Sequence, residues 1–92
     1  MIAARRPEES DVYRELKIVN PTAMVARGLH GAYIGHSAGL RPVAVYDYEE
    51  CIQIIMGDLS LSYEEAVDYL SEHVVPDMVG IDMPVFVVEK TR

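Results

Sequence analysis

The sequence predicts a small α+β domain, and three observations support this fold class. Two β-branched runs, residues 42–47 and 84–89, each open with a proline, which suits the first residue of a strand. Two other stretches, residues 47–57 and 62–74, repeat apolar side chains at helical spacing. A chain of 92 residues is long enough for one hydrophobic core but not for two. We therefore expect a single domain with both strands in one small sheet, packed against two or three helices.

The first expected helix covers residues 7–19. Pro7 suits its first position, because the missing N–H group of a proline has no partner to lose there. Glu8 and Glu9 then place negative charge at the positive end of the helix dipole. The apolar side chains that fall on one face are Val12, Leu16 and Val19.

The chain on either side of this helix is less regular. Residues 1–6 are expected to be flexible. Asn20, followed by Pro21, ends the helix and is also a good N-cap, so it predicts a second helix over residues 22–31. Glycines 28 and 31 leave the end of that second helix undefined.

The strand at residues 42–47 runs directly into the helix at 47–57. Asp47 ends the strand and is a favourable N-cap for the helix. Apolar residues recur along the helix and its end at the spacing of one face, namely Tyr48, Ile52, Ile55, Met56 and Leu59.

The helix at residues 62–74 carries its own start signal. Ser62 and Glu65, three residues apart, form the pattern of a capping box. The residues expected to face inward from this helix are Tyr63, Ala66, Val67, Leu70 and Val74.

The predicted core combines the inner faces of these elements. Both strands are too apolar to stand at a bare sheet edge, so we expect helices to cover them. Val88 is expected to point away from Val87, since side chains alternate along a strand. The predicted core residues are Val43, Val45, Ile52, Ile55, Met56, Leu59, Ala66, Val67, Leu70, Val85 and Val87.

The net charge of −7 is concentrated in the second half of the chain. Residues 1–42 carry six basic and four acidic side chains, whereas residues 43–92 carry two basic and eleven acidic ones. Such a half repels phosphate backbones and attracts basic surfaces. Direct nucleic-acid binding is therefore disfavoured, and a protein partner with a basic surface is favoured.

The cysteine count and the apolar runs indicate a cytoplasmic location. Cys51 is the single cysteine, which excludes an intramolecular disulfide. The chain opens without an apolar signal segment, and it has no run of 18 apolar residues. We expect no membrane contact and leave the oligomeric state open.

The stretch Gly35-His36-Ser37-Ala38-Gly39 fits the G-x-S-x-G pattern of a serine hydrolase nucleophile elbow. An elbow needs a helix directly after the serine, but Pro42 follows closely and disfavours helical geometry in the residue before it. We interpret Ser37 as part of a loop that leads into a strand. A small enzyme or enzyme subunit that uses this loop is the alternative.

No metal or cofactor site is expected. The histidines at positions 30, 36 and 73 have neither the i, i+4 spacing of a helical ligand pair nor that of a metal knuckle. Cys51 lies among isoleucines with Glu49 and Glu50 nearby, which raises the pKa of a thiol and favours a packing role.

An acidic surface is the strongest functional candidate. Glu64, Asp68 and Glu72 recur every four residues, and no Lys or Arg lies between positions 59 and 78. Like charges at this spacing destabilise a helix slightly, so the face either keeps the protein soluble or binds a basic partner. Tyr48 and Tyr63 are expected to face inward, which leaves two tyrosines as interface anchors. The candidate partner-binding residues are Glu64, Glu65, Asp68, Glu72, Glu49, Glu50, Tyr46 and Tyr69.

From residue 42 to residue 89 the sequence resembles a group of small proteins of unknown function that are common in bacteriophages and prophages. The matching motifs are a strand ending in Tyr-Asp, then YEECIQIIM, SYEEAVDYL, a Val-Gly turn and PVFV. This resemblance implies a phage gene product in a bacterial cytoplasm, with no catalytic residue assigned. The expected function is a non-enzymatic binding or inhibitor protein. Its concrete form is an anti-defence, anti-CRISPR-like inhibitor whose carboxylates imitate the phosphates bound by a host nucleic-acid-binding complex.

Overall fold

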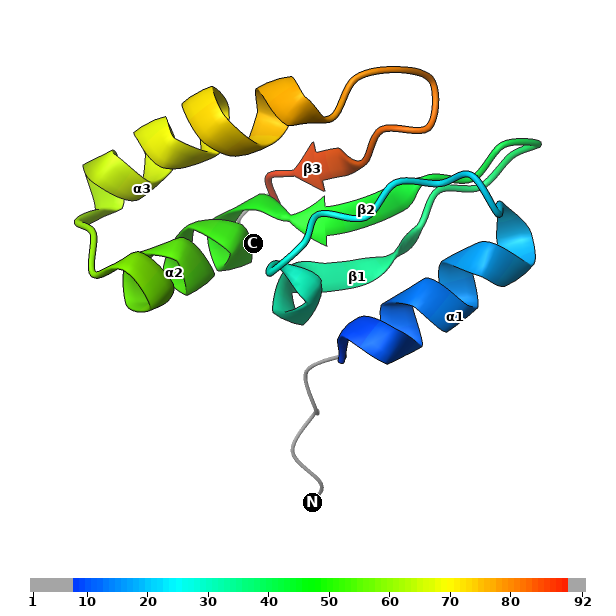
Figure 1. Ribbon diagram of the computed structural model, residues 1–92, viewed down its shortest axis with the longest axis horizontal. Coiled ribbons are helices and arrows are strands. Elements are labelled where there is room, and N and C mark those ends of the chain that lie inside the picture. Colours follow the sequence, from blue (N-terminus) through cyan, green and yellow to red (C-terminus); the bar gives the residue numbers. More distant parts are fainter. Residues whose placement is uncertain (1–7, 90–92) are drawn as a thin grey trace.

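A computed structural model describes residues 8–89, and it shows an α+β fold in which helices flank a small mixed sheet (Figure 1). The expected flexible residues 1–6 and the helix start at Pro7 lie outside the described part of the chain. The elements in chain order are α1 (Glu9–Val19), the 3-10 turn η1 (His30–Ala32), β1 (Tyr33–His36), β2 (Ala44–Asp47), α2 (Tyr48–Leu59), α3 (Tyr63–Tyr69), the π-helical turn η2 (Leu70–Val74), the 3-10 turn η3 (Val75–Asp77) and β3 (Val85–Val87).

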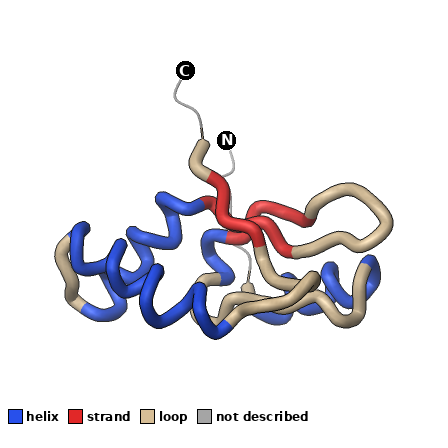
Figure 2. The backbone as a smooth tube through the Cα atoms, turned by 90° about the horizontal axis from the view of Figure 1, so that it is seen from above, coloured by secondary structure: helices blue, strands red, loops and turns tan. Residues whose placement is uncertain are grey.

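The sheet has the order β1-β2-β3. β1 and β2 are antiparallel, with Tyr33 opposite Tyr46, whereas β2 and β3 are parallel, with Val45 opposite Val85. The prediction that the strands at 42–47 and 84–89 lie in one sheet is confirmed. Figure 2 shows the three strands gathered at the centre of the molecule, with helices on either side.

One expectation about the sheet is wrong, namely that neither predicted strand stands at an edge. The sheet has a third strand, β1, which makes β2 the central strand. β3 consequently stands at an edge of the sheet, and Val85 is 42% exposed although its apolar side chain suggested full cover. The pairing of β1 is irregular between Tyr33 and Gly35, and Gly35 has a φ of 147°, a region that favours glycine.

The helix starts agree with the sequence. The Asp47 side chain accepts a hydrogen bond from the Glu50 N–H at 3.3 Å, which caps α2. Ser62 and Glu65 form the predicted capping box at the start of α3. α2 packs against α3 and against η1, and Figure 1 shows α1 on the opposite side, next to β1.

The helix predicted over residues 22–31 does not form. Residues 20–29 are irregular, and only the short turn η1 follows them. The Asn20 side-chain oxygen accepts a bond from the Thr22 N–H at 3.2 Å, which favours a turn rather than a helix start. Gly28 has a φ of 83°, and this left-handed conformation excludes a continuous helix.

The core agrees with the prediction in part. Val43, Ile52, Ile55, Ala66 and Leu70 are buried, whereas Val45, Met56, Val67 and Val87 are partly buried. Leu59 was expected to be buried but is 45% exposed, because α2 ends at this residue. Val88 is exposed, whereas its neighbour Val87 is partly buried. Buried residues that the prediction omitted include Val12, Leu16, Ala26, Leu29, Ala32, Tyr33, Ala44, Tyr46, Cys51 and Met78.

Candidate functional site

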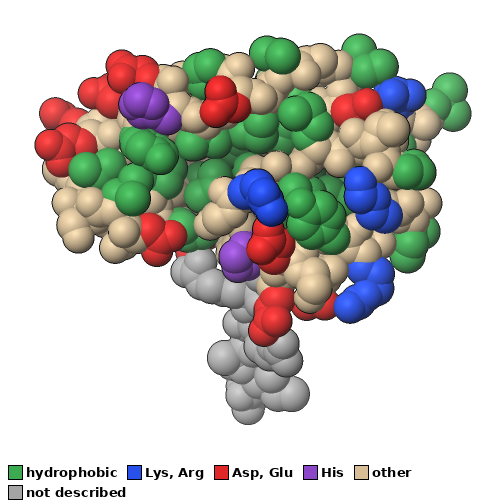
Figure 3. All heavy atoms as spheres, in the orientation of Figure 1, with side chains coloured by type: hydrophobic (Ala, Val, Ile, Leu, Met, Phe, Trp, Pro, Cys, Tyr) green, Lys and Arg blue, Asp and Glu red, His purple; other side chains and the backbone are tan. Residues whose placement is uncertain are grey.

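The three acids Glu64, Asp68 and Glu72, called the acidic stripe below, lie along the outer side of α3 and η2. All three are exposed, and none has an ion pair or a hydrogen bond with any residue that the structure describes. In Figure 3 acidic side chains gather at the upper left, over α3, whereas the Lys and Arg side chains of this face lie at the centre and right. The acidic stripe is therefore a separate negative region of the surface.

The helix beneath the acidic stripe is not a uniform α-helix. The predicted helix over residues 62–74 is α-helical only from Tyr63 to Tyr69. It then widens into a π-helical turn, in which the Val75 N–H donates to the Leu70 carbonyl. The regular α-helical spacing therefore holds between Glu64 and Asp68 but not between Asp68 and Glu72.

Glu65 differs from its neighbours on α3 because its carboxylate has a structural partner. It accepts a hydrogen bond from the Ser62 N–H at 2.9 Å, while the Ser62 hydroxyl oxygen accepts one from the Glu65 N–H at 3.2 Å. Both residues are exposed. The Glu65 charge therefore adds to the negative surface, but its side chain is held at the start of the helix.

Glu49 and Glu50, the candidate acids on α2, also have partners. The Glu49 carboxylate accepts hydrogen bonds from the Tyr63 hydroxyl at 2.9 Å and from the Gln53 amide at 3.2 Å. Tyr63 is 43% exposed, so the prediction that it faces inward is wrong. The bond to Glu49 raises the pKa of Tyr63. Glu50 lies half-buried in the first turn of α2.

Tyr46 was expected to be an interface anchor, but the structure buries it completely. Its hydroxyl accepts a hydrogen bond from the Ala26 N–H at 2.9 Å, and its ring stacks on Phe86 with centroids 5.6 Å apart. The Tyr33 ring also contacts the Tyr46 ring in a T-shaped arrangement, with the centroids 5.7 Å apart. Burial raises the pKa of the Tyr46 hydroxyl. Tyr46 is therefore a core residue that a partner cannot reach.

Tyr69 is half-buried and remains a candidate anchor. Its ring lies 5.0 Å from the His73 ring, one turn further along. Tyr69 also lines one of two adjoining hollows between the 24–29 loop and the helices α2, α3 and η2. It therefore lies between the acidic stripe and an apolar part of the surface.

The two hollows form what we call the apolar groove. Arg27 and Val74 line both of them, so the hollows share a boundary. The first, of about 170 Å³, is lined also by Gly28, Leu29, Ile54, Ile55, Asp58, Leu59 and Tyr69. The second, of about 310 Å³, is lined also by Met24, Val25, Ala26, His73, Asp77 and Met78. The groove was not predicted from the sequence, because the 24–29 segment was expected to be part of a helix.

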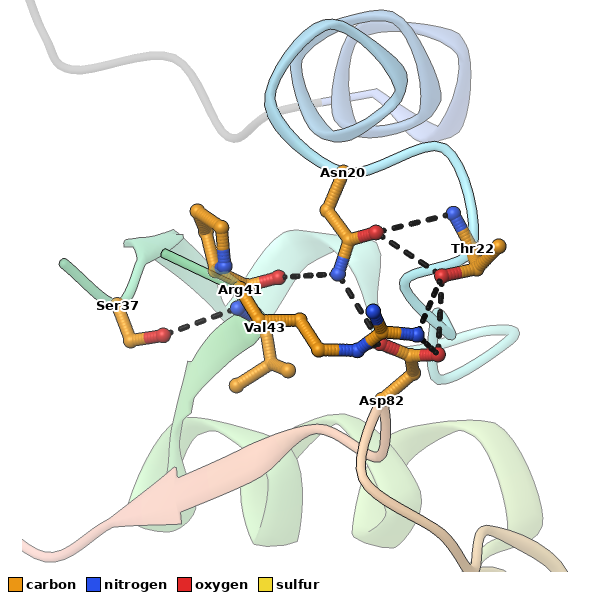
Figure 4. A network of polar contacts seen from close by, with 7 residues as sticks. Asn20, Thr22, Ser37, Arg41, Val43 and Asp82 are labelled. Atoms are coloured by element: carbon orange, nitrogen blue, oxygen red, sulfur yellow. Dashed lines mark hydrogen bonds and ion pairs between the residues drawn. The ribbon is translucent and has the colours of Figure 1, made fainter. Parts of the chain in front are cut away.

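A polar network closes the far end of the molecule (Figure 4). The Asp82 carboxylate accepts two hydrogen bonds from the Arg41 guanidinium, both at 2.9 Å, one from the Thr22 hydroxyl at 2.9 Å and one from the Asn20 amide at 3.1 Å. The bonds from Arg41 are the largest cause of a lowered pKa at Asp82. The buried Asn20 amide also donates to the Pro42 carbonyl at 2.8 Å. The network thus joins three loops that are far apart in the sequence.

Ser37 lies in the connection between β1 and β2, where no helix follows it. Its hydroxyl oxygen accepts a hydrogen bond from the Val43 N–H at 2.9 Å, and its own N–H donates to the Val43 carbonyl at 2.9 Å. Figure 4 shows the side chain directed at this backbone. The local geometry is therefore that of a loop closure, unlike the strand-to-helix turn of a nucleophile elbow.

Cys51 is fully buried in α2. Burial, together with the negative charges of Asp47 and Glu50, raises the pKa of the Cys51 thiol to about 12. Within residues 8–89 the structure brings together no three His, Cys, Asp or Glu side chains in positions to hold a metal ion. In the same range, none of the helices has the length and apolar character needed to cross a membrane.

No protein-family model, curated protein or solved structure matches this chain. Its function is therefore inferred from the geometry of its own residues.

Proposed function

We propose that this chain is a non-enzymatic binding protein whose acidic stripe docks on the basic surface of a protein partner. The observation that carries the proposal is that Glu64, Asp68 and Glu72 are exposed and have no cationic neighbour among the described residues. Like charges four residues apart cost a helix about 0.2–0.5 kcal/mol per pair, whereas a Glu–Lys pair gains a similar amount. A stripe without such relief is costly to the free protein and favourable to a complex with a basic partner.

The partner that suits this surface is a protein that normally holds nucleic acid. A basic groove built for phosphates attracts clustered carboxylates over several ångströms and accelerates their association. Such a groove would also discriminate against neutral surfaces. Together with the resemblance to small phage proteins, this favours an inhibitor that acts in a bacterial cytoplasm against a host defence complex, in the manner of an anti-CRISPR protein.

The test compares two charge reversals that change the net charge equally. The first variant is Glu64→Lys, Asp68→Lys and Glu72→Lys, and the control variant is Glu8→Lys, Glu9→Lys and Asp11→Lys at the start of α1. Each protein serves as bait for a bacterial host extract, and the captured partner is then purified for affinity measurements. We expect the first variant to lose binding and the control to retain it.

Salt provides the second arm of the test. Raising the salt from about 50 to about 500 mM shortens the Debye length from roughly 14 to roughly 4 Å, so binding through exposed charges weakens. Circular dichroism and thermal unfolding check that all variants fold, since surface substitutions usually change stability by less than about 0.5 kcal/mol. The proposal would be refuted if the partner's affinity did not change with salt and were the same for the first variant as for the native protein.

A further inference from the structure

The apolar groove lies beside the acidic stripe and shares helical segments with it. Tyr69, His73 and Val74 line the groove from α3 and η2, the same segments that carry Asp68 and Glu72. π-Helical turns within α-helices are frequent at functional sites, and this one falls where the groove meets the stripe. A partner held by the acidic stripe would therefore also contact the groove.

Charged side chains around the groove have a defined order. Asp58 lines the first hollow, Asp77 lines the second, and Arg27 stands on the boundary between them. None of the three has an ion pair or hydrogen bond with the part of the chain that the structure describes. The groove thus presents negative, positive and negative charge in sequence, with apolar side chains between.

We propose that this groove receives an apolar segment of the partner that is flanked by basic residues at both ends. The inference rests on the proposed function, because it assigns the groove to the same basic partner. The flanking Lys or Arg side chains pair with Asp58 and Asp77, and an acidic side chain or a backbone carbonyl near the middle of the segment accepts from Arg27. An amphipathic helix laid into an apolar groove is a common mode of peptide recognition.

The lining of the groove suits an apolar occupant. Met24 and Met78 face the larger hollow, and methionine side chains adapt their shape to different binding partners. Leu59, at the end of α2, is 45% exposed beside the smaller hollow. Apolar side chains that enter this groove lose contact with water, which favours binding.

A second copy of this chain is a poorer occupant. The net charge of −7 makes two copies repel each other, and the acidic stripe next to the groove adds to that repulsion locally. The same negative charges attract a basic segment of a partner. The charge pattern therefore selects a basic partner over self-association.

The test uses synthetic peptides and the methionine methyl signals of the intact chain. The main probe is a peptide of about 14 residues, or about four helical turns, with Leu at one face, Glu in the middle and Lys at both ends. One control peptide replaces Leu with Ser and keeps the charges, and another replaces the terminal Lys with Glu. With ¹³C-labelled methionines, we expect the main probe to shift the methyl signals of Met24 and Met78 but not those of Met56 and Met83.

The affinity of the main probe is then compared between two groove variants and a matched control. Val25→Gln with Leu59→Gln changes the groove lining without changing charge, and Ile18→Gln is the control on α1, where the side chain is 78% exposed. We expect the groove variant to bind the main probe about tenfold more weakly than the control does. Asp58→Asn with Asp77→Asn should weaken the main probe and reduce its salt dependence, without weakening the peptide that has Glu at both ends.

Each outcome separates this inference from the proposed function. If the main probe loses affinity only when the acidic stripe is reversed, and Met24 and Met78 do not respond, the groove inference is wrong while the proposed function stands. If the Glu-ended peptide shifts Met24 and Met78 as strongly, the required basic flanks are wrong. Methyl shifts that depend on protein concentration without peptide would assign the groove to a second copy and overturn the inference.

Discussion

Asp82 and the acidic stripe carry the same chemical group in opposite settings. The Asp82 carboxylate accepts four hydrogen bonds, two of them from a guanidinium, and its side chain is only 16% exposed. Glu64, Asp68 and Glu72 face solvent without such partners among the described residues. A carboxylate that is paired inside the molecule contributes to folding, whereas an unpaired one is available to another molecule. Substitutions in the Asp82 network should therefore change stability, and those in the stripe should change binding.

The largest effect is expected at Asn20, which lies buried at the centre of the network. Asn20→Ala removes the amide that donates to the Pro42 carbonyl and to Asp82, and it leaves that buried carbonyl without its partner. The free energy of unfolding should fall by about 1–3 kcal/mol in a denaturant titration. Glu64→Ala in the acidic stripe is the control and should change it by less than about 0.5 kcal/mol. Equal losses at the two sites would remove the distinction between the regions.

Ser37→Ala should have a smaller effect on stability. The variant loses the hydrogen bond between the Ser37 hydroxyl and the Val43 N–H, which costs about 1 kcal/mol in thermal unfolding. Affinity for a partner should not change, because Ser37 lies outside both the stripe and the groove. A fluorophosphonate probe provides the complementary measurement, since labelling of Ser37 would contradict its structural role.

The stabilisation that the Asp82 charge provides should be lost only in acid. Its pKa in the folded protein lies below the ordinary value of 3.8, so its ionised form stabilises the fold above that pH. This contribution is lost as the pH falls below about 4 and the carboxylate takes up a proton. The native protein should have a higher Tm than Asp82→Asn, and this difference should therefore become smaller between about pH 5 and pH 2. A constant Tm difference over that range would contradict the ion pair with Arg41.

The smallest effect is expected at the centre of the acidic stripe. Asp68→Lys replaces a repulsion with an attraction to Glu64, four residues earlier on α3, in the more favourable order of acid before base. Stability should rise by about 0.5 kcal/mol, while affinity for a basic partner should fall. Asp68→Asn separates the two contributions, because it removes the repulsion alone. A loss of stability in Asp68→Lys would show that Asp68 has a structural role.

Local signals account for what the sequence predicted well. The caps at Asp47 and Ser62 act within four residues of themselves, so their effect can be read directly from the chain. The second helix was predicted wrongly because the Asn20 side-chain oxygen closes a turn with Thr22, and the Asn20 amide binds Asp82, 62 residues away in the sequence. β1 has no β-branched run beyond Ile34, and its strand conformation depends on pairing with β2.

The inner face of the central strand was predicted only in part, for a related reason. Of the two residues directed to the core, Val43 is buried but Val45 is only partly buried, whereas Ala44 and Tyr46 are completely buried. A central strand covered on both sides is apolar at every position, so alternation does not indicate its inner face. Tyr46 thereby changed from a candidate anchor to a core residue. The groove could not be predicted either, because its walls come from three separate segments of the chain, residues 24–29, 54–59 and 69–78.

The buried thiol of Cys51 can report how often the folded protein opens around α2. A thiol with a pKa of about 12 and no exposed surface does not react with a maleimide or a disulfide reagent while α2 stays in place. Every labelling event then records a moment at which the core around Ile52 has come apart. The labelling rate of the Cys51 sulfur, measured at increasing denaturant concentration, would distinguish local opening of the structure from cooperative unfolding. The same rate, measured with and without a bound partner, would give the free energy that binding adds to the fold.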